Sequence, residues 1–144
     1  MFLSFFSSKN QKLVKQWTKE HKEILELTTK VSDAYKNNKY YTAKKTLKEL
    51  RKITLRHLMT EDNELYKLTQ SSGESNIEIE SFVNEFNESF QDTKAALIHL
   101  LKEYTTDKAV LDGKFFKSFN ILVLRLRKRF VYEEENLYKS LVDS

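Results

Sequence analysis

The 144-residue chain has no cysteine and no proline, and it has only two glycines. Without cysteine it can form neither disulfides nor the thiolate sites that bind zinc or iron–sulfur clusters. Few positions would interrupt a helix, so a chain rich in lysine, glutamate and leucine is expected to be almost entirely helical. At this length we expect a single domain, residues 1–144, that is large enough to bury a core.

The charge pattern and the first residues exclude several classes of protein. The formal net charge is only +4, and the densest basic run, at residues 125–129, is interrupted by Leu126. This is typical of a solvated helix face rather than a nucleic-acid-binding patch. The start, MFLSFFSS, lacks a preceding basic segment and is too short to span a membrane. We interpret it as a hydrophobic cap on one end of the fold, with a loose adhesive tail as the alternative. We expect a cytoplasmic protein without nucleic-acid or membrane partners.

The chain also lacks the common signatures of an enzyme. The sequence shows no nucleophile–base pair, no glycine-rich phosphate loop and no paired acid–base carboxylates, so we do not expect catalysis.

One segment of the chain occurs twice. Residues 56–66 read RHLMTEDNELY and residues 128–138 read KRFVYEEENLY, so the two copies are offset by half the length of the chain. Acidic residues, a leucine and a tyrosine fall at matching positions. This spacing indicates two copies of one helical unit.

The two copies differ at one informative position. In the first copy, His57 and Glu61 are four residues apart, which places an imidazole and a carboxylate on one helix face. This arrangement is typical of metal ligands inside helix bundles. In the second copy the carboxylate is kept as Glu133, but Arg129 replaces the histidine.

Apolar residues recur at helical spacing in four segments, about residues 9–36, 40–70, 75–104 and 115–141. Polar breaks separate them, and residues 75–78 fit an N-terminal capping box. Because the connections are short, neighbouring helices must run antiparallel. The sequence therefore predicts an all-α fold, an antiparallel up-down-up-down four-helix bundle.

Several polar residues fall on the inward faces of these helices when residues are placed at about 100° steps. They are His21, His57, Glu61, Glu64, Arg129 and Glu133. His21, His57 and Arg129 fall within roughly 5 Å of one level along the bundle. His99 lies opposite its apolar stripe and is expected at the surface. Four acidic residues of the repeat are interpreted as solvated charges or helix pairs rather than ligands, including the inward Glu64: Asp62, Glu64, Glu134 and Glu135. Tyr66 and Tyr138 are interpreted as packing near the bundle ends.

These residues resemble the hemerythrin-like (HHE) domain family. That family is a four-helix bundle with an inward histidine on helix one and His-x-x-x-Glu on helices two and four. The matching segments here are WTKEH, HLMTEDNELY and RFVYEEENLY, and the resemblance covers essentially the whole chain. Complete members also have a histidine on helix three, and they bind a non-haem di-iron centre. That centre meets oxygen, nitric oxide or peroxide, or it senses iron and redox state.

The resemblance implies a reduced metal site in this chain. His21, His57 and Glu61 would bind one metal ion, non-haem iron or another divalent metal, with Glu133 as a bridging or fourth ligand. Arg129 stands where a second metal would need a histidine, and a guanidinium cannot act as a ligand. We therefore expect at most one metal, and a buried Arg129 that pairs with Glu133 or Glu61. The implied function is sensing of a small diatomic ligand or of redox state, or iron handling.

Two alternatives remain open. In the first, the chain binds no metal, and the inward polar residues form a buried network of ion pairs and hydrogen bonds. In the second, the chain is a protein-interaction module. The segments LVKQW at 13–17 and RFVYE at 129–133 also resemble the bacterial anti-sigma regulator family that sequesters the housekeeping sigma factor. That resemblance implies a metal-free bundle whose first or fourth helix contacts a protein partner.

Overall fold

The computed structural model describes residues 2–70 and 77–143, and their side chains except those of residues 2–8, 68–70, 77–79, 82, 140 and 143. The helices are α1 (Phe2–Lys36), α2 (Tyr40–Gln70), α3 (Ile77–Tyr104) and α4 (Gly113–Tyr132). A π-helical turn, η2 (Glu133–Leu137), and a short helix, α5 (Tyr138–Asp143), continue directly from α4. No strand occurs in the described ranges, so the predicted all-α four-helix bundle is confirmed.

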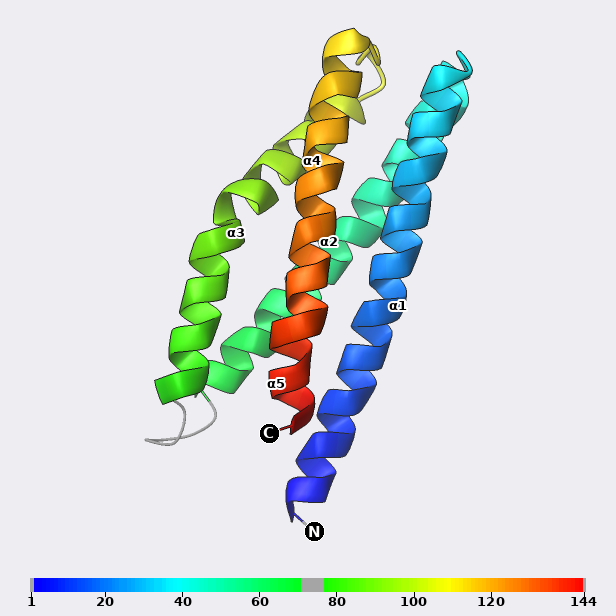
Figure 1. The fold of residues 1–144 in the computed structure, drawn as a ribbon. Helices are drawn as coiled ribbons and strands as arrows, with labels where there is room; N and C mark the ends of the chain where they lie inside the picture. The colour runs from blue at the N-terminus through cyan, green and yellow to red at the C-terminus, as the bar shows by residue number, and fades with distance from the viewer. Residues whose placement is uncertain (1, 71–76, 144) are drawn as a thin grey trace.

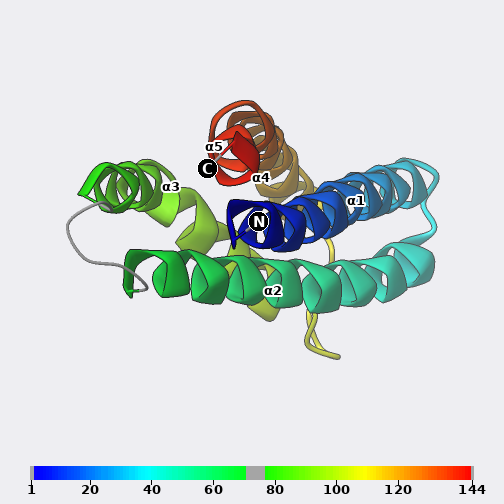
Figure 2. The same cartoon turned by 90° about the horizontal axis from the view of Figure 1, so that it is seen from below.

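The helices run alternately up and down. Figure 1 shows α1 rising from the N-terminus, α2 descending, α3 rising, and α4 with α5 descending to the C-terminus. In the view from below, α1 lies along α2, and the α4–α5 rod lies on the side of α1 that faces away from α2 (Figure 2). α3 lies beside the C-terminal half of α2. None of the described helices is both long enough and apolar enough to cross a membrane.

Local sequence signals account for the helix ends. Asn38 ends α1 in the left-handed region at φ 59°, and the amide of Lys39 donates to the carbonyl of Ala34 at 2.8 Å. This is the hydrogen-bond pattern of a Schellman motif, in which asparagine tolerates positive φ. At the start of α4, the Asp112 side chain accepts a 2.9 Å hydrogen bond from the amide of Phe115, as an N-cap does.

The start of α1 differs from the prediction. The helix begins at Phe2 rather than near Lys9, because residues 2–8 contain no proline or glycine that would delay its start. The proposed hydrophobic cap formed by these first residues lies outside the described side chains. The capping box at residues 75–78 and the break at residues 71–73 also lie outside what the structure describes.

The fourth helical segment is not a regular α-helix to its end. Within η2 the backbone amide of Tyr138 donates to the carbonyl of Glu133, five residues earlier, rather than to residue 134. Such a turn holds one more residue than an α-helical turn, and π turns are frequent at functional sites. The expected helical spacing through residue 141 is therefore shifted after Glu133.

The core consists of two apolar clusters separated by a layer of polar residues. One cluster extends from the α1–α2 and α3–α4 connections to the middle of the bundle and includes Ile24, Val31, Leu47, Leu101, Phe115, Phe119 and Phe130. The other, on the side of the chain ends, contains Trp17, Leu65, Val83, Phe86, Leu137, Tyr138 and Leu141. We refer to them as the upper and the lower cluster, after the orientation of the helices in Figure 1. The polar layer holds His21, His57, Glu61, Arg129 and Glu133.

Candidate metal site

Four predicted ligands meet in the polar layer. One ligand atom from each of His21, His57, Glu61 and Glu133 can be chosen so that all four lie within 4.8 Å of one another. Their side chains come from α1, α2 and η2, and each residue is at most 2% exposed. The structure thus brings together every metal-ligating residue that the sequence predicted.

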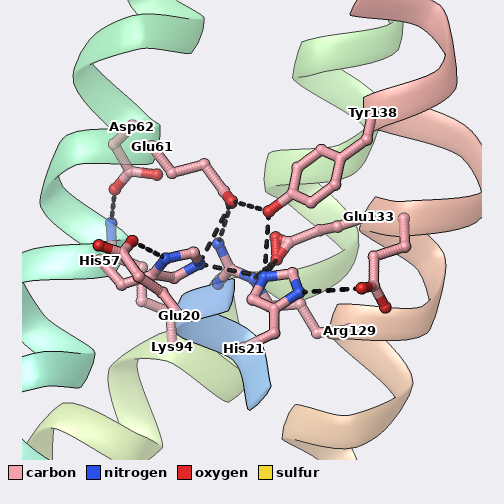
Figure 3. Close-up of polar contacts among 10 residues, drawn as sticks. Glu20, His21, His57, Glu61, Asp62, Lys94, Arg129, Glu133 and Tyr138 are labelled. Atoms are coloured by element: carbon pink, nitrogen blue, oxygen red, sulfur yellow. Dashed lines mark hydrogen bonds and ion pairs between the residues drawn. The ribbon is translucent and has the colours of Figure 1, made fainter. Parts of the chain in front are cut away.

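The distances between these atoms are those found between ligands of one metal ion. Nε2 of His21 is 3.1 Å from Nε2 of His57 and 3.3 Å from Oε1 of Glu133. Nε2 of His57 is 3.4 Å from Oε2 of Glu61. Ligands that each bind a metal at about 2.0–2.2 Å stand about 3.0–3.5 Å apart in tetrahedral or octahedral geometry. Figure 3 shows the dashed contacts converging on His21.

Arg129 lies beside these four residues, as predicted. It is 3% exposed, its Nη2 donates to Oε1 of Glu61 at 3.3 Å, and its Nε lies 3.7 Å from Oε1 of Glu133. The other face of the guanidinium lies 5.2 Å from the ring centroid of Phe86, a cation–π contact. Arg129 is therefore a buried, paired cation, whereas the rest of its basic run is exposed.

Both histidines have a carboxylate on the ring nitrogen that faces away from the site. Nδ1 of His57 is 2.8 Å from Oε1 of Glu20, and Nδ1 of His21 is 3.8 Å from Oε1 of Glu134. A carboxylate hydrogen-bonded at this position favours the proton on the outer nitrogen of a neutral imidazole and leaves the inner nitrogen able to bind a metal, and Glu20 makes this contact with His57. The Glu134 contact with His21 is too long for a hydrogen bond. Glu20 was not among the residues predicted for the site. Its helical spacing to Trp17 and Ile24 was the available signal, and its partner is the histidine of the other helix.

Tyr138 also belongs to the site, so its predicted place near a bundle end is wrong. It is 2% exposed, its hydroxyl donates to Oε2 of Glu61 at 2.8 Å, and the same oxygen is 3.0 Å from Nε2 of His21. The π turn explains this, because it stacks Tyr138 on Glu133. Tyr66, the matching residue of the first copy, is 65% exposed.

Burial and charge set the protonation of the two histidines. Burial, together with the charges of His57 and Arg129, lowers the pKa of His21 to about 3, so this imidazole is neutral at neutral pH. Burial alone would also lower the pKa of His57. The hydrogen bonds and negative charges of Glu61 and Glu20 outweigh burial, and the pKa of His57 is raised.

The two inner carboxyl groups titrate in opposite directions. Burial acts to raise the pKa of Glu61, but its interactions with His57 and Glu133 and the charge of Arg129 lower it to about 2. Burial and the negative charge of Glu61 hold the pKa of Glu133 well above its usual range. Burial and the same carboxylates raise the pKa of the Tyr138 hydroxyl. In the metal-free chain, the surroundings thus favour the anion at Glu61 and the protonated form at Glu133.

The hydrogen bonding of the site is incomplete. Among the described residues, both carboxyl oxygens of Glu133, Nδ1 of His21 and Nε of Arg129 are buried without a hydrogen-bond partner of normal geometry. Buried polar atoms usually find partners. Two imidazoles and two carboxylates are also a donor set that suits iron, manganese or zinc. The residues present therefore fit a metal ion.

The remaining predicted residues lie away from the centre. Glu64 is only partly buried and pairs with Lys67 at 3.5 Å, which confirms the helix-pair interpretation and not the inward placement. Asp62 makes an ion pair with Lys94 of α3. His99 is exposed and lies 3.6 Å from Glu103, as predicted for a surface histidine.

A groove lies between α1 and α4. It has a volume of about 920 Å³, and the residues that line it include His21, Leu25, Phe130, Val131, Lys15, Lys22 and Arg127. His21 therefore borders both the polar layer and this groove.

A scan against protein-family models and searches of curated proteins and of solved structures found no match to this chain.

Proposed function

We propose that the chain is a hemerythrin-like domain protein that binds one non-haem metal ion through His21, His57, Glu61 and Glu133. Iron is the metal that the family resemblance favours. One observation supports the proposal: donor atoms from α1, α2 and η2 lie within 4.8 Å of one another, and three contacts between these side chains are 3.1–3.4 Å, the separation of ligands around a single ion. A bound iron would supply redox and small-ligand chemistry, and the proposed role is sensing of oxygen, nitric oxide or redox state, or iron handling.

The protein side chains prepare the site for one ion rather than two. Glu20 orients His57, and Arg129 neutralises Glu61 at the place where a second cation would otherwise lie. A second ion beside the guanidinium would meet a permanent positive charge. The groove between α1 and α4 borders His21 and is the side from which we propose that an ion or a small ligand approaches.

Metal content is the measurement that tests this proposal. We expect the full chain, purified without chelators, to carry or take up one equivalent of iron, and His57→Ala to take up none. His99→Ala is the matched control, because it removes an exposed histidine and should leave the stoichiometry unchanged. A wild-type chain that binds neither iron nor zinc would refute the proposal, and two metals per chain would refute the single-ion site.

A second candidate function rests on the outer face of α4. Ile121, Leu124 and Val131 are exposed apolar side chains on this helix, and Arg125 and Lys128 lie among them. Exposed apolar residues with a charged surround are common in protein-binding surfaces. On this alternative the chain is an anti-sigma-type interaction module, and a bacterial housekeeping sigma factor should bind it without metal. Leu124→Asp should then abolish binding, whereas an unchanged affinity would exclude this face.

A further inference from the structure

Tyr138 places a fifth oxygen donor among the four predicted ligands. Its hydroxyl oxygen is 2.8 Å from Oε2 of Glu61 and 3.0 Å from Nε2 of His21. These are again the separations of atoms that share one metal ion. The four-residue ligand set therefore does not exhaust the donors that face the centre.

The ring of Tyr138 is held in place by its neighbours. It stacks on the ring of His21 with centroids 5.5 Å apart and packs against Trp17 at 5.5 Å. Its backbone amide is tied to Glu133 by the π turn. A side chain that packing and backbone hold in this way loses little conformational freedom when it binds a metal ion, so it is preorganised for that role.

We propose that Tyr138 is a fifth protein ligand, and that its phenolate makes the site selective for ferric iron over divalent metals. This inference rests on the proposed metal-binding function. Binding would break the O–H bonds of Tyr138 and Glu133 and the Nε2–H bond of a protonated His57, form oxygen–iron and nitrogen–iron bonds in their place, and release these protons to solvent, without a change in oxidation state.

Charge balance supports a trivalent ion. Glu61, Glu133 and a phenolate at Tyr138 together carry three negative charges, which equals the charge of ferric iron. Among the neighbouring charged groups, Arg129 pairs with Glu61 and Glu20 pairs with His57, and the partly exposed Glu134 lies 3.8 Å from His21. A divalent ion would leave one negative charge uncompensated in a buried site, where unpaired charge is unfavourable.

Absorption spectroscopy on the full chain tests the proposal directly. The chain is loaded with one equivalent of ferric iron, supplied as its nitrilotriacetate complex, and in parallel with zinc sulfate. We expect one iron per wild-type chain and a visible phenolate-to-iron charge-transfer band. Tyr138→Phe should keep a site that binds zinc but lose the band. Removing even an outer-sphere partner typically weakens metal binding about 10–100-fold, so iron affinity should fall at least that much.

Tyr66→Phe is the matched control, because it changes the repeat-equivalent tyrosine outside the site and should leave the band intact. Tyrosinate vibrations in the resonance Raman spectrum of the wild-type chain give the same answer without any variant, should Tyr138→Phe fold poorly. One iron per chain without a charge-transfer band, or a band that persists in Tyr138→Phe, would overturn the fifth ligand while leaving the metal site standing. A chain that binds neither iron nor zinc would overturn both.

Discussion

Tyr66 and Tyr138 occupy the same position in the two copies of the repeat, yet Tyr66 is 65% exposed and Tyr138 is 2% exposed. The first copy is α-helical throughout, so five residues turn Tyr66 about 140° away from Glu61. In the second copy the π turn stacks Tyr138 on Glu133. The width of one helical turn, and not the residue type, decides which tyrosine reaches the site.

The copies also differ in what they contribute to the polar layer. His57 contributes an imidazole whose Nδ1 contacts Glu20 and whose Nε2 faces the centre. Arg129, at the matching position, contributes a fixed positive charge to Glu61. The first copy thus brings His57 and Glu61 to the layer, and the second brings Glu133, Tyr138 and a cation.

Truncation of the cation should have the largest effect. In metal-free protein, Arg129→Ala leaves the buried Glu61 carboxylate without its guanidinium, and breaking a buried pair typically costs about 3–5 kcal/mol. Urea unfolding followed by circular dichroism, with a chelator present, measures this loss. Lys128→Ala, an exposed neighbour, is the control. Equal stability of the two variants would mean that Arg129 is not an essential partner of the carboxylates.

Conversion of the second copy into the first is the next test. Arg129→His restores His-x-x-x-Glu beside Glu133 and removes the positive charge that opposes a second ion. We expect elemental analysis to find two metals per chain instead of one. Arg125→His adds a histidine on the exposed side of α4 and should leave the stoichiometry at one. A content of one metal in Arg129→His would show that the guanidinium is not what limits the site to a single ion.

The two tyrosines should differ in their contribution to stability. Tyr138→Phe removes a hydrogen bond to the ionised Glu61, and such bonds contribute about 1.5–3 kcal/mol. Tyr66→Phe changes an exposed side chain, and surface substitutions usually stay within about 0.5 kcal/mol. Urea unfolding of both variants in the metal-free state makes the comparison. Similar losses in the two would contradict the placement of Tyr138 in the site.

Removal of the extra residue should have the smallest effect. Deleting the exposed Glu135 places Tyr138 four residues after Glu133, which is still the same face of a regular α-helix. We expect a change below about 1 kcal/mol, the size of one hydrogen bond, and an unchanged charge-transfer band.

Deletion of Asn63, the matching residue of the first copy, is the control for this test. It should rotate the buried Leu65 about 100° out of the core, and losing a buried leucine costs about 2–5 kcal/mol. Two deletions of equal cost would show that η2 does not hold a surplus residue.

Helical periodicity explains which parts of the site could be predicted. His21, His57, Glu61 and Glu133 all precede or begin the π turn, so steps of 100° placed them inward correctly. Tyr138 follows the turn, and no local pattern in EEENLY signals the extra residue. The repeat did not signal it either, because Tyr66 has similar sequence neighbours and both tyrosines were predicted to pack near the bundle ends.

Contacts between helices account for the other omission. Glu20 falls on the stripe of α1 between Trp17 and Ile24, so its inward position follows from the spacing, but its partner is His57 on α2. A pairing across helices depends on their crossing, which residue spacing within one helix does not encode. The bundle itself was predictable, because the four apolar stripes and the polar breaks are properties of each segment alone.

The polar layer between the two apolar clusters also bears on how the molecule opens. The lower cluster contains segments close to both chain ends, including Trp17 and Leu141, whereas the upper cluster is closed by two short connections. Two such clusters can unfold separately when few apolar contacts join them. Amide hydrogens around Trp17 should therefore exchange sooner than those around Leu47. An ion held by α1, α2 and η2 would couple the two halves into one cooperative unit.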